Sequence, residues 1–142
     1  MTVATLLNEK GASVVTARED TSLAEIANLL SENRIGAVVI ADGQRRPVGI
    51  VSERDIVHVI AKEGPGALGK KAGDVMIRKL ITCGPEDTIY EIMNLMTRHR
   101  IRHLPIVVDG KLGGIISIGD VVKSRIAEVE LEATEMKRYI AG

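Results

Sequence analysis

Aromatic side chains are almost absent from this chain of 142 residues, which has no Trp, no Phe and only Tyr90 and Tyr139. Proteins that bind single-stranded nucleic acids stack the bases on aromatic rings. The charges point the same way, because 19 Lys and Arg balance 19 Asp and Glu, and a net charge of +0 creates no field that would gather polyanions. We therefore expect no nucleic-acid partner.

Cysteine and long apolar runs are also scarce. Cys83 stands alone, which excludes an internal disulfide and a thiolate zinc site and suits a reducing compartment. No apolar run approaches the roughly 18 residues of a membrane helix, and the N-terminus lacks the apolar stretch of a signal peptide. We expect a soluble, cytoplasmic protein without membrane contact.

Catalytic constellations are missing as well. The three histidines, His58, His99 and His103, do not have the spacing of metal ligands. No Cys/His pair at catalytic spacing, no phosphate-binding glycine loop and no catalytic pair of acids outside the repeated Ser-x-x-Asp occurs. We expect no metal site, no catalytic cofactor and no enzyme activity. Cys83 is expected to be a small buried side chain.

What the chain does contain is an internal repeat. Shifted by 66 positions, residues 14–40 align with residues 80–106 without a gap, and eight aligned pairs are identical. A shift of 65 then aligns the Gly-apolar-apolar-Ser run that begins at Gly49 with the run that begins at Gly114. Two copies of one supersecondary unit bury their apolar faces together. We therefore expect the function to lie where the halves meet.

Each copy has the pattern of a β-α-β-β-α unit. Capping boxes at Ser22 and Thr88, each with Glu three residues later, precede apolar residues at helical spacing. A short strand is expected before the first box, at residues 14–16. We predict an α+β (α/β) fold with two β-α-β-β-α repeats and with flanking helices at both ends.

The second part of each unit is a hairpin followed by a helix. Tight turns are expected at Asp42-Gly43 and at Asp109-Gly110, because Asp-Gly is a strong signal for a two-residue hairpin. The second helix of each copy is expected to begin at Ser52 or at Ser117.

These patterns divide the chain into five segments. The expected segments are an N-terminal helical segment (1–13), repeat 1 (14–62), a linker (63–75) that begins with a flexible connector (63–69), repeat 2 (76–127) and a C-terminal helix extension (128–142). The last helix carries apolar residues on or near one face. Two interpretations stay open for it: packing against its own body, or a dimer contact.

The sequence Ser-x-x-Asp recurs at Ser52/Asp55 and at Ser117/Asp120, and it has two interpretations. In the structural one, Ser is an N-cap and Asp completes a capping box, which is worth about 1 kcal/mol. In the functional one, the carboxylate accepts hydrogen bonds from the two hydroxyls of a ribose, at roughly 1.5–3 kcal/mol each. A glycine three residues before each Ser would let a flat ligand approach, and Ile115 could pack on its face. Because the whole motif recurs, we favour the functional interpretation.

Cations gather where the helix of the second copy becomes a strand. Arg102 and His103 replace Gly36 and Ala37 of the first copy, and this change suggests an anionic partner such as phosphate. Arg54 either pairs with a neighbouring acid or contacts phosphate. Thr16 and Thr82 either meet a ligand ring nitrogen or satisfy backbone groups.

With these residues in place, the chain resembles a tandem pair of cystathionine beta-synthase (CBS) domains of the small stand-alone bacterial type. The resemblance rests on the sequence Gly-Ile-Val-Ser-Glu-Arg-Asp that ends at Asp55, its counterpart that ends at Asp120, and the run His-Arg-Ile-Arg-His-Leu-Pro-Ile-Val-Val-Asp-Gly at 99–110. It covers nearly the whole chain and implies two repeats related by pseudo-twofold symmetry, with two clefts that bind adenine nucleotides such as AMP, ATP or NAD.

The resemblance also implies which residues form the two sites. One would use Val15, Thr16, Ser52 and Asp55; the other Ile81, Thr82, Ser117 and Asp120, with Ile101, Arg102 and His103 nearby; Gly36 and Ala37 would line either. Asp120 is the safer ribose ligand. A homodimer that forms a flat four-domain disc is further implied. The leading hypothesis is a regulatory module that senses nucleotides, and the alternative is an interaction scaffold that binds none.

Overall fold

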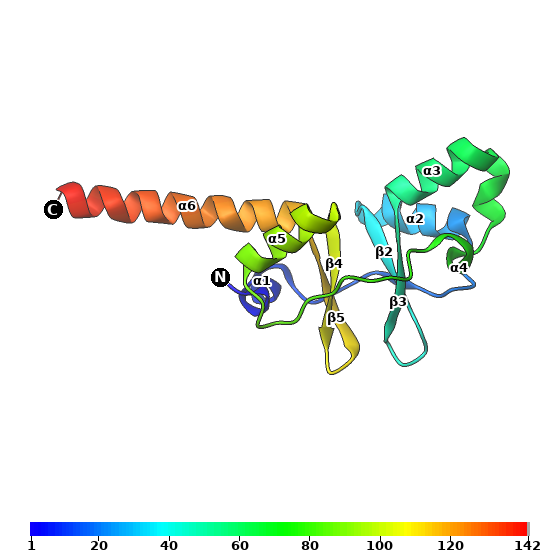
Figure 1. Ribbon diagram of the computed structural model, residues 1–142, viewed down its shortest axis with the longest axis horizontal. Coiled ribbons are helices and arrows are strands. Elements are labelled where there is room, and N and C mark those ends of the chain that lie inside the picture. The colour runs from blue at the N-terminus through cyan, green and yellow to red at the C-terminus, as the bar shows by residue number, and fades with distance from the viewer. Residues whose placement is uncertain (142) are drawn as a thin grey trace.

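The structure is a computed structural model that describes residues 1–141, and it consists of two similar halves side by side with a long helix projecting from one end (Figure 1). The first half contains β1 (Thr16–Ala17), α2 (Leu23–Asn33), β2 (Ala37–Ala41), β3 (Pro47–Ser52) and α3 (Glu53–Glu63). The second half contains α5 (Ile89–His99), β4 (His103–Val108), β5 (Lys111–Ser117) and α6 (Ile118–Ala141). The mixed helix and sheet fold predicted from the repeat is confirmed.

The first helices of the two halves begin and end alike. The Ser22 hydroxyl accepts a hydrogen bond from the Glu25 N–H at 3.2 Å, and the Thr88 hydroxyl accepts one from the Glu91 N–H at 3.1 Å. Both helices end at an arginine in the left-handed conformation, Arg34 or Arg100. The predicted helix starts at Ser22 and Thr88 are thus confirmed.

The first strand differs between the halves. In the first half β1 lies parallel to β2 and begins at Thr16, slightly later than the predicted strand 14–16. In the second half the counterpart is reduced to one bridge, between Cys83 and Ile106. The next hydrogen bond of a parallel ladder would need an N–H from Pro105, which has none, so the strand cannot extend back toward Ile81.

The two hairpins also differ. Between β4 and β5 the predicted tight turn is present, with Asp109 and Gly110 both at positive φ (53° and 76°), as a type I′ turn requires. Between β2 and β3 the tight turn predicted at Asp42-Gly43 is replaced by a longer loop, residues 42–46. The Asp42 carboxylate holds this loop, because it accepts hydrogen bonds from the backbone N–H groups of Gln44 and Arg46, each at 2.9 Å.

The segment between the repeats is folded, whereas a flexible connector was predicted over residues 63–69. It forms the short helices η1 (Pro65–Gly69) and α4 (Ala72–Val75). The Leu23 N–H donates to the Lys70 carbonyl at 2.9 Å, and the Ala72 N–H donates to the Thr21 carbonyl at 2.7 Å. Because Ala72 is fully buried in the first core, this segment is part of the first half.

The two halves exchange their leading helices. The N-terminal helix α1 (Val3–Lys10) precedes the first repeat in sequence, but its Val3 and Leu6 lie in the core of the second half. Conversely α4, which precedes the second repeat, packs in the first core. Matching bridges join Thr2 to Thr88 and Lys71 to Ser22. The helix that precedes each repeat in the sequence therefore completes the hydrophobic core of the other repeat.

The glycines of the Gly-apolar-apolar-Ser runs serve this exchange. A Cβ atom on Gly49 would lie 2.4 Å from the Met76 sulfur, and one on Gly114 would lie 2.9 Å from Leu7 Cδ2. Met76, which follows α4, thus occupies the space beside Gly49, and Leu7 of α1 occupies the space beside Gly114. The interpretation that these glycines admit a flat ligand is not supported, because protein atoms already fill the space.

The last helix, α6, extends well beyond the body (Figure 1). Val121 and Ser124 are buried near its start, where it packs beside α5. Every residue of α6 from Val129 onward is exposed. Within residues 1–141, no helix is both long enough and apolar enough to cross a membrane.

We predict that Gly49→Ala destabilises the protein by about 1–3 kcal/mol, because the added methyl group overpacks the Met76 side chain. Met76→Ala removes the clash but leaves a cavity, so the double variant should cost less than the sum of the two single changes. Urea unfolding measures all three. Gly69→Ala is the matched control, because nothing lies within 4 Å of a Cβ there. Strictly additive costs would contradict the contact.

Candidate functional site

Both Ser-x-x-Asp motifs form complete capping boxes at the starts of α3 and α6. Asp55 Oδ2 accepts from the Ser52 N–H at 2.8 Å and from the Ser52 hydroxyl at 2.9 Å, and the Asp55 N–H donates back to Ser52 Oγ at 3.2 Å. The corresponding distances for Ser117 and Asp120 are 2.9, 2.9 and 3.2 Å. The caps use one carboxylate oxygen of each Asp. Within residues 1–141 the other oxygen, Oδ1, has no hydrogen-bond partner, so the capping role leaves an acceptor for a ligand.

The two carboxylates differ in their counter-ions. Lys10, the last residue of α1, places its ammonium 2.6 Å from Asp120 Oδ2 and donates to the Ile115 carbonyl at 2.8 Å. Burial alone would raise the pKa of Asp120, but the hydrogen bonds from Lys10 and Ser117 outweigh it and hold the pKa below its ordinary value. Asp55 has no such cation among the described residues. Sequence reasoning missed Lys10, since no pattern places the N-terminal helix on the second half.

His103 and Gly36 meet at the junction of the halves. A Cβ atom built on Gly36 would lie 3.1 Å from two atoms of the His103 ring and 3.7 Å from the Glu53 carboxylate. Burial lowers the pKa of His103, although the nearby Glu53 acts in the opposite direction. His103 is therefore mostly neutral near pH 7, so Arg102 is the permanent cation of this pair.

An arginine-lined cavity of about 320 Å³ lies between the two halves. Arg54 from the first half and Arg100 and Arg102 from the second line it, with Met96, Thr97, Ile101 and Ile118. Within residues 1–141 these three arginines form no ion pair. Arg54 and Ile118 lie in the first turns of α3 and α6, so two helix N-termini add their positive ends to the cavity. The cavity is suited to an anion.

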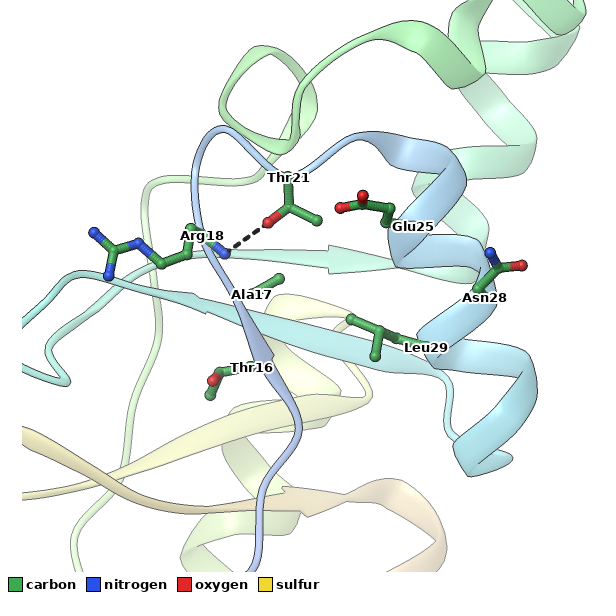
Figure 2. Close-up of a pocket in the computed structure, with 7 residues that line it drawn as sticks. All are labelled: Thr16, Ala17, Arg18, Thr21, Glu25, Asn28 and Leu29. Carbon is green, nitrogen blue, oxygen red and sulfur yellow. Dashed lines mark hydrogen bonds between the residues drawn. The ribbon is translucent and has the colours of Figure 1, made fainter.

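Thr16 lines two other cavities. One, of about 410 Å³, lies between β1 and α2, and Figure 2 shows its seven lining side chains, among them Thr16, Glu25 and Leu29. The other, of about 360 Å³, reaches the second half through Leu112. There the Leu112 N–H donates to the Arg45 carbonyl at 2.8 Å, a contact that no sequence signal announces.

The structure brings together only part of the predicted site. Thr16 is separated from Ser52 by β2, because the strand order is β1-β2-β3. At the usual strand spacing this is about 10 Å, so only a ligand could link them. Ala37 is buried at 4% exposure inside β2. The remaining predicted residues lie as follows: Val15 and Ile81 are half-buried against the first and second cores, Ile115 is half-buried in β5, and Thr82 is exposed.

Cys83 lies in the second core. Burial, and to a lesser extent Asp87, raises the pKa of its thiol to about 12, so the side chain stays an unreactive thiol at neutral pH. Residues 1–141 also hold no group of three or more His, Cys, Asp or Glu side chains that could bind a metal ion.

We predict that His103 makes stability depend on pH between about 7.5 and 5.5. An unfolded histidine has a pKa of about 6.5, and burial lowers the pKa of His103 in the folded state. The unfolded state therefore takes up more protons as the pH falls, and stability is lost below about pH 6.5. Urea unfolding across this range should show a smaller loss for His103→Gln than for the parent chain. Equal losses would contradict the prediction.

Comparison with known proteins agrees with this architecture. The family model described as "CBS domain" matches residues 10–62 and 72–127. The mitochondrial CBS domain-containing protein CBSX3 of Arabidopsis thaliana is 33% identical over 99% of this chain and 72% of its own length. A crystal structure of a CBS-domain-containing protein from Agrobacterium tumefaciens superposes with a TM-score of 0.85 at 41% identity, covering 88% of this chain and 99% of that one.

A more distant structure has the same fold with ligands bound. The CBS domain pair of protein MJ0100, in complex with 5′-methylthioadenosine and S-adenosyl-L-methionine, has a TM-score of 0.81 and covers 90% of this chain and 98% of that one. At 23% identity this likeness concerns the fold alone. The duplicated unit, the family match over most of the chain and the close structural relatives lead to one conclusion: this chain belongs to the CBS-domain family as a tandem pair of CBS repeats.

Proposed function

We propose that this CBS pair is a regulatory module that senses adenosine nucleotides, AMP, ATP or NAD(H), in the clefts between its two repeats. The observation that carries the proposal is the meeting of two Ser-x-x-Asp helix starts with an arginine-lined cavity at the junction. A carboxylate acceptor for a sugar and unpaired guanidinium groups for phosphates are the two polar requirements of a nucleotide.

The sugar would bind at the capping carboxylates. Asp55 and Asp120 each keep Oδ1 without a partner among the described residues, and the capping bonds fix the orientation of each carboxylate. Such a pre-positioned acceptor loses little conformational entropy when the diol binds. Asp55 has no counter-ion, whereas a diol at Asp120 must share that carboxylate with Lys10.

The phosphates would bind in the arginine-lined cavity. Arg54 and Arg102 approach it from opposite halves, so a phosphate held by both would bridge the repeats. Because guanidinium groups bind phosphate oxygens in a bidentate manner, this contact would favour one relative placement of the halves. That coupling between ligand and arrangement is what a sensor requires.

Three further observations support the proposal. The fold is one in which protein MJ0100 holds adenosine-derived ligands. Lys10 links the second carboxylate to α1, which gives a route from ligand to the N-terminal segment. The lone, buried thiol of Cys83 suits the reducing cytoplasm, where we propose that the protein acts. We also propose that it acts as a homodimer.

The second candidate function is an interaction scaffold that binds no nucleotide. The long exposed helix α6 favours it, because its apolar side chains are available to a partner. The two functions differ in one measurement, the binding of adenosine nucleotides.

We predict that the double variant Asp55→Asn/Asp120→Asn loses roughly tenfold or more in affinity for AMP, ATP and NAD, because the charged acceptor of the diol is gone. Asn keeps an acceptor oxygen for each cap, so the fold should persist. Isothermal titration calorimetry measures affinity, and thermal unfolding measures stability.

Asp74→Asn is the matched control, because Asp74 caps α4 in the same way, accepting from the Lys71 N–H, but lies away from the junction. Lys10→Met should not weaken binding of uncharged adenosine, since it only removes the competitor for Asp120. Parent-like affinity in the double variant would exclude Asp55 and Asp120 as ligands of the nucleotide sugar. If the parent chain binds no adenosine nucleotide, the interaction scaffold remains as the candidate function.

We predict that Arg102→Ala and Arg54→Ala each weaken ATP more than AMP and leave adenosine unchanged, because only phosphates use the cavity. A loss of roughly tenfold for ATP is expected for one charge-assisted contact. Arg98→Ala is the control, since Arg98 is an exposed cation of α5 that does not line the cavity. Equal losses for adenosine and ATP would place the phosphates elsewhere.

A further inference from the structure

Six exposed apolar residues of α6 are spaced four and three apart in alternation. They are Val122, Ile126, Val129, Ala133, Met136 and Ile140. Alternating steps of four and three residues repeat every seven residues, as positions a and d of a coiled coil do. Ile126, Met136 and Ile140 are 53%, 62% and 78% exposed. We call these six residues the α6 seam.

Nothing within the described chain covers the seam. The last contact of α6 with the body is the ion pair between the N-terminal amine and Glu128, at 3.3 Å. Beyond it the helix continues to Ala141 with every residue exposed. A single helix standing alone in water is marginally stable, and an apolar stripe along it costs free energy until it is buried. The projecting part of α6 therefore needs a partner.

The charges beside the seam select a second copy as that partner. If Ile126 is at position a of the heptad, Arg125 and Glu132 are at g, while Glu130 and Lys137 are at e. In a parallel in-register dimer each g residue faces the e residue five positions later in the other chain. Arg125 then faces the partner's Glu130, and Glu132 faces the partner's Lys137. All of these pairs attract.

Other arrangements bring like charges together. A shift of one heptad sets Arg125 against the partner's Lys137 or Lys123. The antiparallel arrangement that would bury the whole seam sets Lys123 against the partner's Lys137 and Glu130 against the partner's Glu130. Like charges across a seam destabilise it, so the sequence disfavours both alternatives.

We propose that two copies of this chain associate through the α6 seam as a parallel, in-register, two-stranded coiled coil. The inference deepens the homodimer of the proposed function by naming its contact surface, and it does not depend on nucleotide binding. The coiled coil would place the two bodies at the same end, the N-terminal end of the paired helices. Each body would be connected to the coiled coil through the packed first turns of its own α6.

The seam is tested by sedimentation equilibrium of the full chain. Val129→Asp/Met136→Asp should weaken the dimer by roughly tenfold or more, because charge enters the apolar contact. Leu131→Asp is the matched control: Leu131 is 60% exposed on the same helix but lies outside the seam, so its dimer should be unchanged. Circular dichroism confirms that the body stays folded.

Register is tested with charges and with a cross-link. Glu132→Lys alone should weaken the dimer roughly threefold to tenfold, and adding Lys137→Glu should restore it. Ala133→Cys should form a disulfide-linked dimer on oxidation, whereas Leu131→Cys should not. A dimer unaffected by Val129→Asp/Met136→Asp would overturn the seam while keeping the homodimer. A parent chain that is monomeric at every concentration would overturn both the seam and the homodimer. Neither result bears on nucleotide binding, which calorimetry measures separately.

Discussion

The reciprocal packing of α1 and α4 is the interaction on which the rest of this structure depends. Each half completes its core with a helix whose sequence position belongs before the other repeat. Burying Val3 and Leu6 in the second half, and Ala72 and Met76 in the first, ties the halves at two places far apart in sequence. The junction that contains Arg54, Arg102 and His103 is held in place by this exchange rather than by a continuous core.

The exchange also determines what the motif residues do. The glycines before each Ser provide room for Met76 and Leu7, and the Ser and Asp cap the helices that follow. Structural and functional interpretations of Ser-x-x-Asp are therefore not exclusive. One carboxylate oxygen carries the cap, and within residues 1–141 the other oxygen has no hydrogen-bond partner.

Much of the fold could be predicted from the sequence, because its signals are local. The capping residues Ser22 and Thr88, the helix starts at Ser52 and Ser117, and the turn at Asp109 each act within a few residues. The family follows from the repeat as a whole. What sequence reasoning missed is set by distant contacts: Lys10 on Asp120, Met76 over Gly49, and the ordered segment after α3. Periodicity cannot show which half a leading helix joins. The site residues could be chosen only in part, because strand order decides that Thr16 lies apart from Ser52 and burial decides that His103 is mostly neutral.

The proline in β4 makes the backbone pairing of the two halves unequal. Because Pro105 has no N–H to donate, residues 80–82 are not hydrogen-bonded to the neighbouring strand. Their counterparts in the first half lead into β1, which joins a three-stranded sheet. The segment that leads to Cys83 is consequently held by fewer backbone hydrogen bonds than its counterpart in the first half. A duplicated sequence has thus produced one first strand that joins its sheet and one that stops at a single bridge, and the difference originates in a single missing amide hydrogen.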